Sequence, residues 1–514
     1  MNSPSVKTPF RKLLIANRGE IAVRIIRACQ ELNLPVALAA SEADMNSPAA
    51  RLADEVICVG PGPASESYLR QDKIVAAGRE VGADAIHPGY GFLSENADFA
   101  EASEEAGITF VGPPSSVIRL LGDKIRAKNL MAESGVPVMP GYTGENQADD
   151  HLLLEAENIG MPVLIKASAG GGGRGMRVVR EIDQFLPELA EARREAVAAF
   201  GDARVLLEKY VERSRHIEVQ IFGDSHGNVV HLFERECSIQ RRHQKIIEES
   251  PSPVLTPEVR QQITSAAVTA GRAAGYQNAG TVEFLFDESL SGDHKFYFLE
   301  VNTRLQVEHP VTEMLTGIDL VKLQLKVASG EPIGLEQSQI GATGHALEVR
   351  IYAEDPARQF LPSIGDLACW VEPQGPWIRV DSGIKAGGEV SPYYDPMLAK
   401  LIVRGENRSD TIHRMISALK QFHVLGVTTN IGYLLDIVSD EVFQSGQIST
   451  QFLAERFADW KNPTEPPVEV LIAAALASME RTATPSRGAK SPTKSTDNPW
   501  SDASGWRLLA GTKS

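Results

Sequence analysis

The sequence is poor in cysteine, with four in 514 residues: Cys29, Cys58, Cys237 and Cys369. No two of them have Cys-x-x-Cys spacing, so the sequence indicates neither a zinc site nor a disulfide framework. It also lacks the run of roughly 20 apolar residues that spans a bilayer, and the stretch that begins at Met1 lacks the apolar core of a signal peptide. We therefore expect a reducing, cytoplasmic compartment and no membrane partner.

Positive charge is scarce as well. Lys and Arg number 51 against 67 Asp and Glu, which gives a formal net charge of −16. This balance argues against a nucleic-acid partner. A protein this acidic can still bind an anionic ligand, but it must gather Lys and Arg locally.

The N-terminal part alternates strand and helix patterns. Residues 12–16 (KLLIA) predict a buried strand, a helical pattern follows from Ile21, and residues 36–41 (VALAAS) predict a second strand. A β-α-β opening implies a parallel sheet. Far along the chain, residues 480–499 are rich in Pro, Ser, Thr and Lys and predict a flexible linker.

A glycine run at residues 170–173 lies between two predicted strands, with Lys166 on the strand before it. Backbone N–H groups without Cβ obstruction can converge on phosphate oxygens, and a lysine at that place can reach a nucleotide phosphate. The run is not a Walker A loop, because no Lys-Ser/Thr pair follows the glycines. The alternative is a flexible linker.

Residues 296–312 (FYFLEVNTRLQVEHPVT) open as a strand. If the chain stays extended, alternation puts one set of side chains on a single face: Phe296, Phe298, Glu300, Asn302, Arg304, Gln306 and Glu308. Carboxylates, an amide and a guanidinium on one face suit a metal, an anion and a proton acceptor. The alternative is a solvated edge strand.

Two further patterns point to charged ligands. Glu283 and Glu300 lie on the two strands of a predicted hairpin, and with Asn302 their oxygens suit Mg²⁺ held with ATP phosphates. Like charges set close together are unfavourable without a cation; the alternative is a surface pair. The cationic run 240–245 (QRRHQK) suits an anion, or else is a solvated basic loop.

Long stretches resemble biotin carboxylase, a family of ATP-grasp enzymes. They are IANRGEIAVRIIRAC at 15–29, HPGYGFLSEN at 87–96, IKASAGGGGRGM at 165–176, ERECSIQRRHQKIIEE at 234–249, EVNTRLQVEHPVTE at 300–313, GHALEVRIYAED at 344–355 and SPYYDPMLAKL at 391–401. The resemblance covers residues 10–455.

The resemblance implies an α/β ATP-grasp fold in four parts. These are a doubly wound parallel-sheet domain at 1–122, an ATP-grasp region at 123–340 with a glycine-rich lid at about 138–210, an α+β C-terminal domain at 341–458, and a tail at 459–514. The tail resembles the entry to the middle domain of acyl-CoA carboxylase α chains.

The resemblance also implies a reaction. Bicarbonate attacks the γ-phosphate of ATP, with Mg²⁺ or Mn²⁺, to give carboxyphosphate, and the CO₂ it releases is captured by biotin. The residues that the resemblance implies for contact with ATP are Lys124, Lys166, Gly172, Gly173, Glu208, Lys209, Val211, His216, Gln240 and His243. Those implied for metal binding are Glu283, Glu300 and Asn302. The residues implied for binding bicarbonate are Lys245, Arg304, Gln306 and Val307. Glu308 is the general base, and Arg350 stabilises the biotin enolate; Lys245, Arg304, Glu308 and Arg350 form the catalytic set.

The implied partners are a biotin carrier, a carboxyltransferase and a second copy of the chain, met through Arg27, Glu31 and Trp370. No Ala-Met-Lys-Met biotinylation signature occurs in the sequence, so biotin is expected on another polypeptide or segment. Three alternatives remain: the biotin carboxylase subunit of a pyruvate carboxylase, an ATP-grasp ligase joining a carboxylate to an amine, and a nucleotide-sensing scaffold. The acyl acceptor is not specified.

Overall fold

The computed structural model describes residues 10–168, 176–242, 244–288 and 295–462, and six further positions between 468 and 476. The chain divides into two units, Met1–Asn462 and Pro463–Ser514. The six described residues of the second unit are helical and exposed. Within the described part of the chain, no helix is long and apolar enough to cross a membrane.

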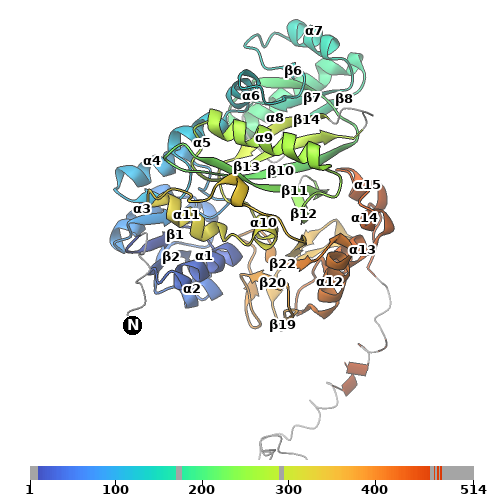
Figure 1. Cartoon of the computed structure of the whole chain (residues 1–514). Coiled ribbons are helices and arrows are strands. Elements are labelled where there is room, and N and C mark those ends of the chain that lie inside the picture. Colours follow the sequence, from blue (N-terminus) through green and yellow to red (C-terminus); the bar gives the residue numbers. More distant parts are fainter. Residues whose placement is uncertain are drawn as a thin grey trace, which may run out of the picture. The chain divides into compact units, whose positions relative to one another are not determined.

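A five-stranded parallel sheet with helices on both faces forms the N-terminal part (Figure 1, blue). The strand order is β3-β2-β1-β4-β5, from β1 (Leu13–Ile15), β2 (Val36–Ser41), β3 (Glu55–Gly60), β4 (Ala85–His87) and β5 (Thr109–Phe110). Its helices are α1 (Gly19–Glu31), α2 (Pro48–Leu52), α3 (Gln71–Glu80), α4 (Ala97–Glu105) and α5 (Ser115–Gly122). Leu13 and Ile15 pack with α1, and Leu14 packs with α3 and α4, as expected for a strand buried on both faces.

The C-terminal region covers the start of α1. A Cβ atom on Gly383 would lie 2.5 Å from the backbone nitrogen of Glu20, so only glycine allows the two backbones to approach this closely. In open parallel sheets, ligands bind where the strand order reverses, here between β1 and β4. In this protein, another part of the same chain packs beside that place.

A small four-stranded antiparallel sheet has its own core (Figure 1, top). It contains β6 (Gly141–Tyr142), β9 (Val205–Lys209), β7 (Val163–Ala167) and β8 (Arg177–Val179), in that order, with α7 (Asp149–Ile159) and α8 (Phe185–Phe200) packed on it. The predicted phosphate loop joins β7 to β8. Its Gly172 and Gly173 lie outside the described residues, so their predicted role stays a prediction.

An eight-stranded antiparallel sheet carries the rest of the first unit. Its order is β14 (Lys295–Asn302), β13 (Asn278–Asp287), β10 (Ser214–Gly223), β11 (Val229–Arg241), β12 (Gln244–Ser250), β15 (His345–Tyr352), β22 (Met397–Gly405) and β20 (Ile378–Ser382). Because β12 pairs with β15, the sheet runs without a break from the central region into the C-terminal region.

Helices cover both faces of this sheet. The helices and remaining strand pairs are α6 (Lys124–Glu133), α9 (Pro257–Ala273), α10 (His309–Thr316), α11 (Leu320–Ala328), α12 (Arg408–Gln421), α13 (Ile431–Ser439), α14 (Glu441–Gln444) and α15 (Phe452–Arg456), with β16 (Glu354–Asp355) beside β17 (Leu361–Pro362), β18 (Gly365–Asp366) beside β21 (Glu389–Val390), and β19 (Cys369–Val371) beside β23 (His423–Leu425). Helices α6 and α9 share an apolar core with β10, β13 and β14. On the other face, α10 packs against β11, β12, β15 and β22. The polar cluster described below lies between α10 and the sheet.

The extended stretch predicted through Glu308 is wrong in two respects. Strand β14 ends at Asn302, and Glu308 is the N-cap of α10. A bulge also shifts the register: Glu300 pairs with Glu283, but Phe298 pairs with Phe284, which leaves Leu299 unpaired. Phe296 and Phe298 therefore join Val301 in the apolar core, while Glu300 lies with Glu283 on the opposite face.

Candidate functional site

Lys245 on β12 is the centre of a buried charged cluster. Its ammonium lies 2.5 Å from Glu218, 2.8 Å from Glu283 and 2.7 Å from Glu308, bringing together β10, β13 and the turn before α10. Burial alone would lower the pKa of Lys245, but the three carboxylates hold it well above its usual value. Lys245 is therefore a permanent cation with three anionic neighbours. The structure brings the predicted Lys245 and Glu308 into direct contact.

Arg235 on β11 is fully buried and contacts this cluster through Glu218. Its guanidinium lies 2.5 Å from Glu218 and donates to Gln306 at 2.7 Å and to Thr312 on α10 at 2.9 Å. A planar guanidinium with five donors suits such a crossing of sheet and loop. Arg235 thus fixes the side chain of the predicted Gln306.

Glu308 joins Lys245 to Arg350. One of its oxygens accepts from Lys245, and the other accepts from Arg350 on β15 at 3.0 Å. Arg350 also donates to Glu248 on β12 at 2.6 Å. Burial would raise the pKa of Glu308, but Lys245 and Arg350 outweigh it and hold that pKa well below its usual range. The row Lys245–Glu308–Arg350 can therefore offer two fixed cations and one carboxylate to an anionic substrate.

Glu283 and Glu300 face each other directly across β13 and β14. Glu283 accepts from Asn302 at 2.8 Å, and the His216 ring lies 3.0 Å from its other oxygen. Burial and repulsion from Glu283 raise the pKa of Glu300. Among the described residues, Glu300 forms no ion pair with a basic side chain. Two opposed carboxylates and an amide are a donor set that fits Mg²⁺ or Mn²⁺.

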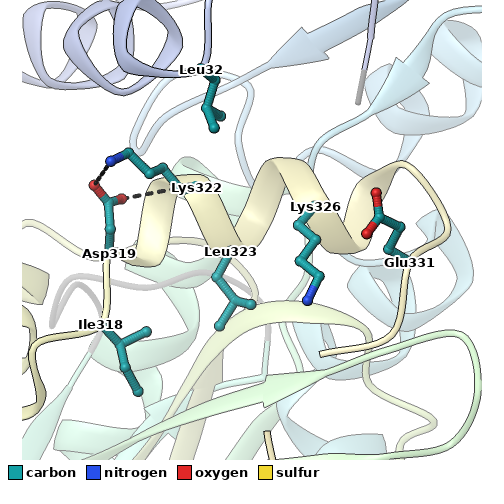
Figure 2. A pocket seen from close by; sticks show the side chains of 7 residues that line it. All are labelled: Leu32, Ile318, Asp319, Lys322, Leu323, Lys326 and Glu331. Carbon is teal, nitrogen blue, oxygen red and sulfur yellow. Dashed lines mark hydrogen bonds and ion pairs between the residues drawn. The ribbon is translucent and has the colours of Figure 1, made fainter. Parts of the chain in front are cut away.

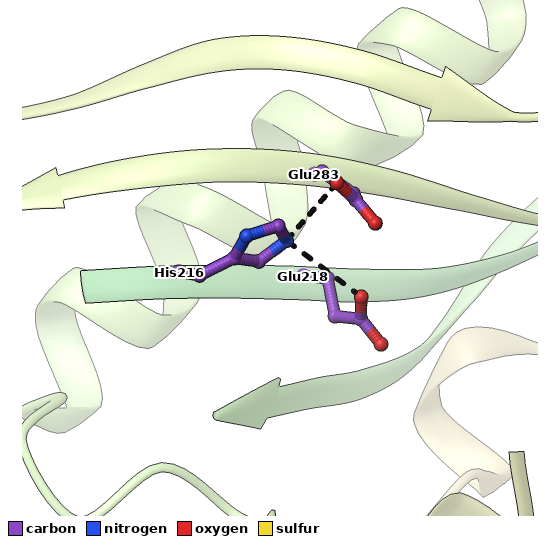
Figure 3. Close-up of side chains that lie close together, drawn as sticks. All are labelled: His216, Glu218 and Glu283. Atoms are coloured by element: carbon purple, nitrogen blue, oxygen red, sulfur yellow. Dashed lines mark ion pairs between the residues drawn. The ribbon is translucent and has the colours of Figure 1, made fainter. Parts of the chain in front are cut away.

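His216 enlarges this donor set (Figure 3). Its ring projects from β10 toward Glu283, and Glu218 lies 3.9 Å from the same ring nitrogen. Donor atoms of these three residues lie within 4.8 Å of one another. Gln240 contacts the other ring nitrogen of His216 at 3.0 Å, which orients the ring. The predicted ATP-contacting residues His216 and Gln240 thus lie beside the predicted metal ligands.

A second group of charged side chains lies where strands β7 and β9 of the small sheet meet α6. Glu208 on β9 contacts Lys166 on β7, and it accepts from Lys128 on α6 at 3.0 Å. Lys124 begins α6, and burial lowers its pKa even though Glu300 opposes this. The structure therefore brings Lys124, Lys166 and Glu208 into one region near Glu300, and their contacts with ATP stay predictions.

Other predicted ATP contacts differ in position. The ammonium of Lys209 donates to the carbonyl oxygens of Gly160 and Met161, because alternation along β9 turns it away from Glu208. A ligand that lies on the same face of β9 as Glu208 could therefore contact the backbone of Lys209 but not its side chain. Val211 follows two residues later and makes no polar side-chain contact. His243 lies outside the described residues.

Two of the residues that hold Arg304 and Val307, Glu95 and Lys400, were not singled out by motif reasoning. Arg304 donates to Glu95 at 2.9 Å and to Asn302 at 3.0 Å. The Val307 carbonyl accepts from Lys400 on β22 at 2.7 Å. Three of the predicted bicarbonate residues, Arg304, Gln306 and Val307, lie in the loop between β14 and α10. This loop contacts Glu95 of the N-terminal part through Arg304 and β22 through Val307.

Replacing Lys400 by methionine is expected to destabilise the protein by about 3–5 kcal/mol. Lys400 is fully buried and lies 3.3 Å from Glu20 and 4.0 Å from Asp381, so its loss leaves buried carboxylates without this cation. Thermal unfolding would measure the change, with exposed Lys420→Met as the control. Adding Glu20→Gln should recover part of the loss; equal midpoints for the two lysine variants would contradict this role.

A separate pocket lies along α11 (Figure 2). Its lining is Leu32, Ile318, Asp319, Lys322, Leu323, Lys326 and Glu331, none of which belongs to the charged cluster. Lys322 pairs with Glu31 and Asp319, and Lys326 donates to the Ile333 carbonyl. Because both ammonium groups already have partners, this pocket offers no ready site for an anion.

Sequence reasoning missed Glu218, Arg235, Glu248 and Lys400. Glu218 lies between buried Ile217 and Val219, and Lys400 lies between buried Ala399 and Leu401. A charged residue between apolar strand residues is the signal that could have found these two, since such side chains are seldom fully buried without a partner. Arg235 and Glu248 have charged neighbours in their strands, so this signal is absent for them.

Family models match most of the chain. "Biotin carboxylase, N-terminal domain" matches residues 9–118, "Carbamoyl-phosphate synthase L chain, ATP binding domain" matches 123–336, and "Biotin carboxylase C-terminal domain" matches 348–455. Biotin carboxylase 1 of Bacillus subtilis is 48% identical over 444 residues, which cover 86% of this chain and 98% of that protein. The mitochondrial methylcrotonoyl-CoA carboxylase subunit alpha of Glycine max is 52% identical over 444 residues. That match covers 86% of this chain, which spans 60% of the longer protein.

A solved structure agrees with these matches. The biotin carboxylase domain dimer of Hydrogenobacter thermophilus 2-oxoglutarate carboxylase, in complex with MgADP, ADP and bicarbonate, superposes with a TM-score of 0.84 at 46% identity. The match covers 88% of this chain and 99% of that one. The α/β ATP-grasp fold predicted from the sequence is confirmed.

Proposed function

The chain belongs to the biotin carboxylase family, and from this premise we propose that it carboxylates a ureido nitrogen of biotin with bicarbonate at the expense of ATP. The observation that carries the proposal is the row Lys245–Glu308–Arg350, in which one carboxylate bridges two buried cations. This row can offer one fixed cation to bicarbonate and the other to an anion that develops later, with a proton acceptor between them.

In the first half-reaction, Lys245 and Arg304 would bind and orient bicarbonate. Glu308 would then take its proton as bicarbonate attacks the γ-phosphate. A carboxylate whose pKa is held this low is a weak base in the free protein. An anionic substrate that draws Lys245 or Arg350 toward itself removes that restraint, so the pKa of Glu308 rises as the substrate binds. The base would be activated only in the loaded site.

In the second half-reaction, the carboxyphosphate would break down to CO₂ and phosphate, the phosphate would take the proton of a ureido nitrogen of biotin, and that nitrogen would form the new C–N bond to CO₂. Arg350 would stabilise the negative charge that develops on the ureido oxygen. Its guanidinium keeps its charge at any working pH, and Glu248 and Glu308 fix its orientation beforehand.

The nucleotide would lie between the small sheet and the large one. Lys124 and Lys166 would neutralise phosphate oxygens, and Glu208, which pairs with Lys128 and Lys166, would lie beside the adenine base. Glu283, Glu300 and Asn302 would hold Mg²⁺ or Mn²⁺, which neutralises phosphate charge when bound. We propose that the glycine run, Gly172 and Gly173 included, closes over ATP and excludes water from carboxyphosphate.

Purified protein with Mg²⁺, ATP and bicarbonate is expected to release ADP, and free biotin should stimulate the release. Glu308→Gln should lower the biotin-dependent rate by about 10²–10⁴-fold, because the substitution removes the proton acceptor. Its effect on the affinity for ATP should be small, since no nucleotide-binding residue changes. Exposed Glu105→Gln is the matched control. A parallel loss of ATP affinity and rate would refute the role of Glu308, and no ADP release by the wild type would refute the proposed function.

The same assay tests the alternatives. A carboxylate–amine ligase would need a larger acid in place of bicarbonate, and a nucleotide-sensing scaffold would bind ATP without turnover. We leave the final acceptor open, because one relative is named for an acyl-CoA and another for 2-oxoglutarate.

The partners are proposals that rest on the family. They are a biotin carrier, a carboxyltransferase and a second copy of this chain. For the homodimer we propose a surface that includes Arg27 and Glu31 on α1 and Trp370 on β19; the first two are exposed, and Trp370 is half-buried. The cytoplasmic location stays a prediction, and the Glycine max relative is named as mitochondrial.

A further inference from the structure

Glu348 is a buried acid that the reaction outlined above does not use. It lies on β15 two residues before Arg350, so both side chains project from the same face of the sheet. Glu348 has no exposed surface, and neither of its carboxyl oxygens has a hydrogen-bond partner among the described residues. Its direct cross-strand neighbour is Glu248 on β12, the acid that anchors Arg350.

Ionising both of these opposed, buried glutamates would cost considerable free energy. Side chains directly opposite on antiparallel strands have Cβ atoms about 4.5–5.5 Å apart. An ionised carboxylate without donors in a dry environment costs several kcal/mol, and a second charge beside it adds repulsion. Burial raises the pKa of Glu248 to about 7, but the hydrogen bond from Arg350 favours the ionised form of this carboxyl. Glu348 has no such partner.

The charged groups around Glu348 are already engaged elsewhere. Lys400 on β22 donates to the Val307 carbonyl and pairs with Glu20. From its own strand, Arg350 contacts Glu248 and Glu308. Helix α10 covers this face and brings His309, which contacts the Gln306 carbonyl, and Glu313, which pairs with Arg24 and Arg379. Lys400 and Arg350 do attract Glu348, but burial and repulsion from Glu248 and Glu308 oppose them.

We propose that the Glu248–Glu348 pair holds one proton at neutral pH, that Glu348 carries it, and that this neutral acid is a positioning residue for Arg350. While Glu348 is protonated, the carboxylates that pair with Arg350 among the described residues are Glu248 and Glu308. Loss of the proton would place a third carboxylate beside the guanidinium and compete with the anion that forms on biotin. This last step rests on the proposed function, whereas the protonation itself does not.

The first test is the pH dependence of unfolding for the wild type and E348Q. In the unfolded chain Glu348 releases its proton near the ordinary pKa of 4.5, while burial keeps it protonated in the folded protein. The wild type therefore loses stability relative to E348Q as pH rises above about 4.5. Between pH 6 and pH 8 the folded-to-unfolded ratio of E348Q should gain about 100-fold on that of the wild type, which is about 2.7 kcal/mol.

Only the slope with pH decides the first test, because a buried amide adds a cost that does not vary with pH. Urea unfolding at pH 6, 7 and 8 measures the slope, with exposed Glu105→Gln as the control that should show no such gain. A difference that stays constant or shrinks over this range would mean that Glu348 is ionised and held by Lys400. That result would overturn the proposal, whatever the enzyme activity is.

The second test addresses Arg350. The alkaline decline of kcat/KM for biotin should move to higher pH in E348Q, because a glutamine cannot acquire the competing charge. Bicarbonate-dependent ADP release without biotin should show the same pH profile in both proteins. An unchanged biotin profile together with the expected unfolding slope would overturn the positioning role and leave the protonation in place. If the wild type released no ADP in the presence of bicarbonate, that result would instead count against the proposed function.

Discussion

Replacing Lys245 by methionine is expected to lower bicarbonate-dependent ADP release by about 10²–10³-fold. The ammonium lies within 2.8 Å of Glu218, Glu283 and Glu308, and it is the cation nearest to the proton acceptor. Without it, bicarbonate meets three carboxylates whose charge is no longer balanced, so both binding and attack become unfavourable. Both KM for bicarbonate and kcat should change.

The variant should still fold, because each carboxylate keeps a second partner. Arg235 remains with Glu218, Arg350 with Glu308, and His216 with Glu283. Steady-state kinetics with varied bicarbonate would measure the effect, and thermal unfolding would check the fold. Lys420→Met on the exposed side of α12 is the matched control. A Lys245→Met protein with near wild-type turnover would refute the central role of this cluster.

Replacing Arg350 by lysine should separate the two half-reactions. Lysine keeps the charge but cannot hold Glu248 and Glu308 at once with the planar geometry of a guanidinium. We expect the biotin-dependent rate to fall by about 10²–10³-fold, because one fixed donor to a developing anion is lost. ADP release without biotin should fall far less, since Lys245 and Arg304 still bind bicarbonate.

Two measurements on each protein test this separation: ADP release with and without free biotin at saturating bicarbonate. Arg79→Lys on the exposed face of α3 provides the same chemical change away from the site. The expected result is a low ratio of biotin-stimulated to basal rate in Arg350→Lys alone. If both rates fall together, Arg350 acts on bicarbonate or on the fold rather than on biotin.

The parts of the fold that the sequence predicted are those with strong local patterns. The β-α-β opening predicted the parallel sheet because residues 13–16 and 36–40, within the two predicted strands, are apolar throughout. The opposition of Glu283 and Glu300 followed from the hairpin pattern, and the structure places them directly across from each other. Long motifs also placed Lys245, Glu308 and Arg350 in one site.

Other parts depend on contacts that no local pattern contains. The supports of the site, Arg235, Glu248 and Lys400, gain their roles only from strands that are distant in sequence. The prediction of an extended strand through Glu308 was wrong because β14 ends at Asn302 and because a bulge at Leu299 shifts its register against β13. The side chain of Lys209 finds its acceptors in another loop, and the predicted contact of this residue with ATP stays a prediction.

The bulge at Leu299 determines how this gene segment tolerates change. Two aromatic residues before it and two ligand-type residues after it occupy opposite faces only because one residue is left unpaired between them. Substituting Leu299 keeps that residue count. Losing its codon alone would remove the offset, so that either Phe296 and Phe298 or Glu300 and Asn302 would have to change sides. At this position a three-base deletion should therefore be far more damaging than any missense change.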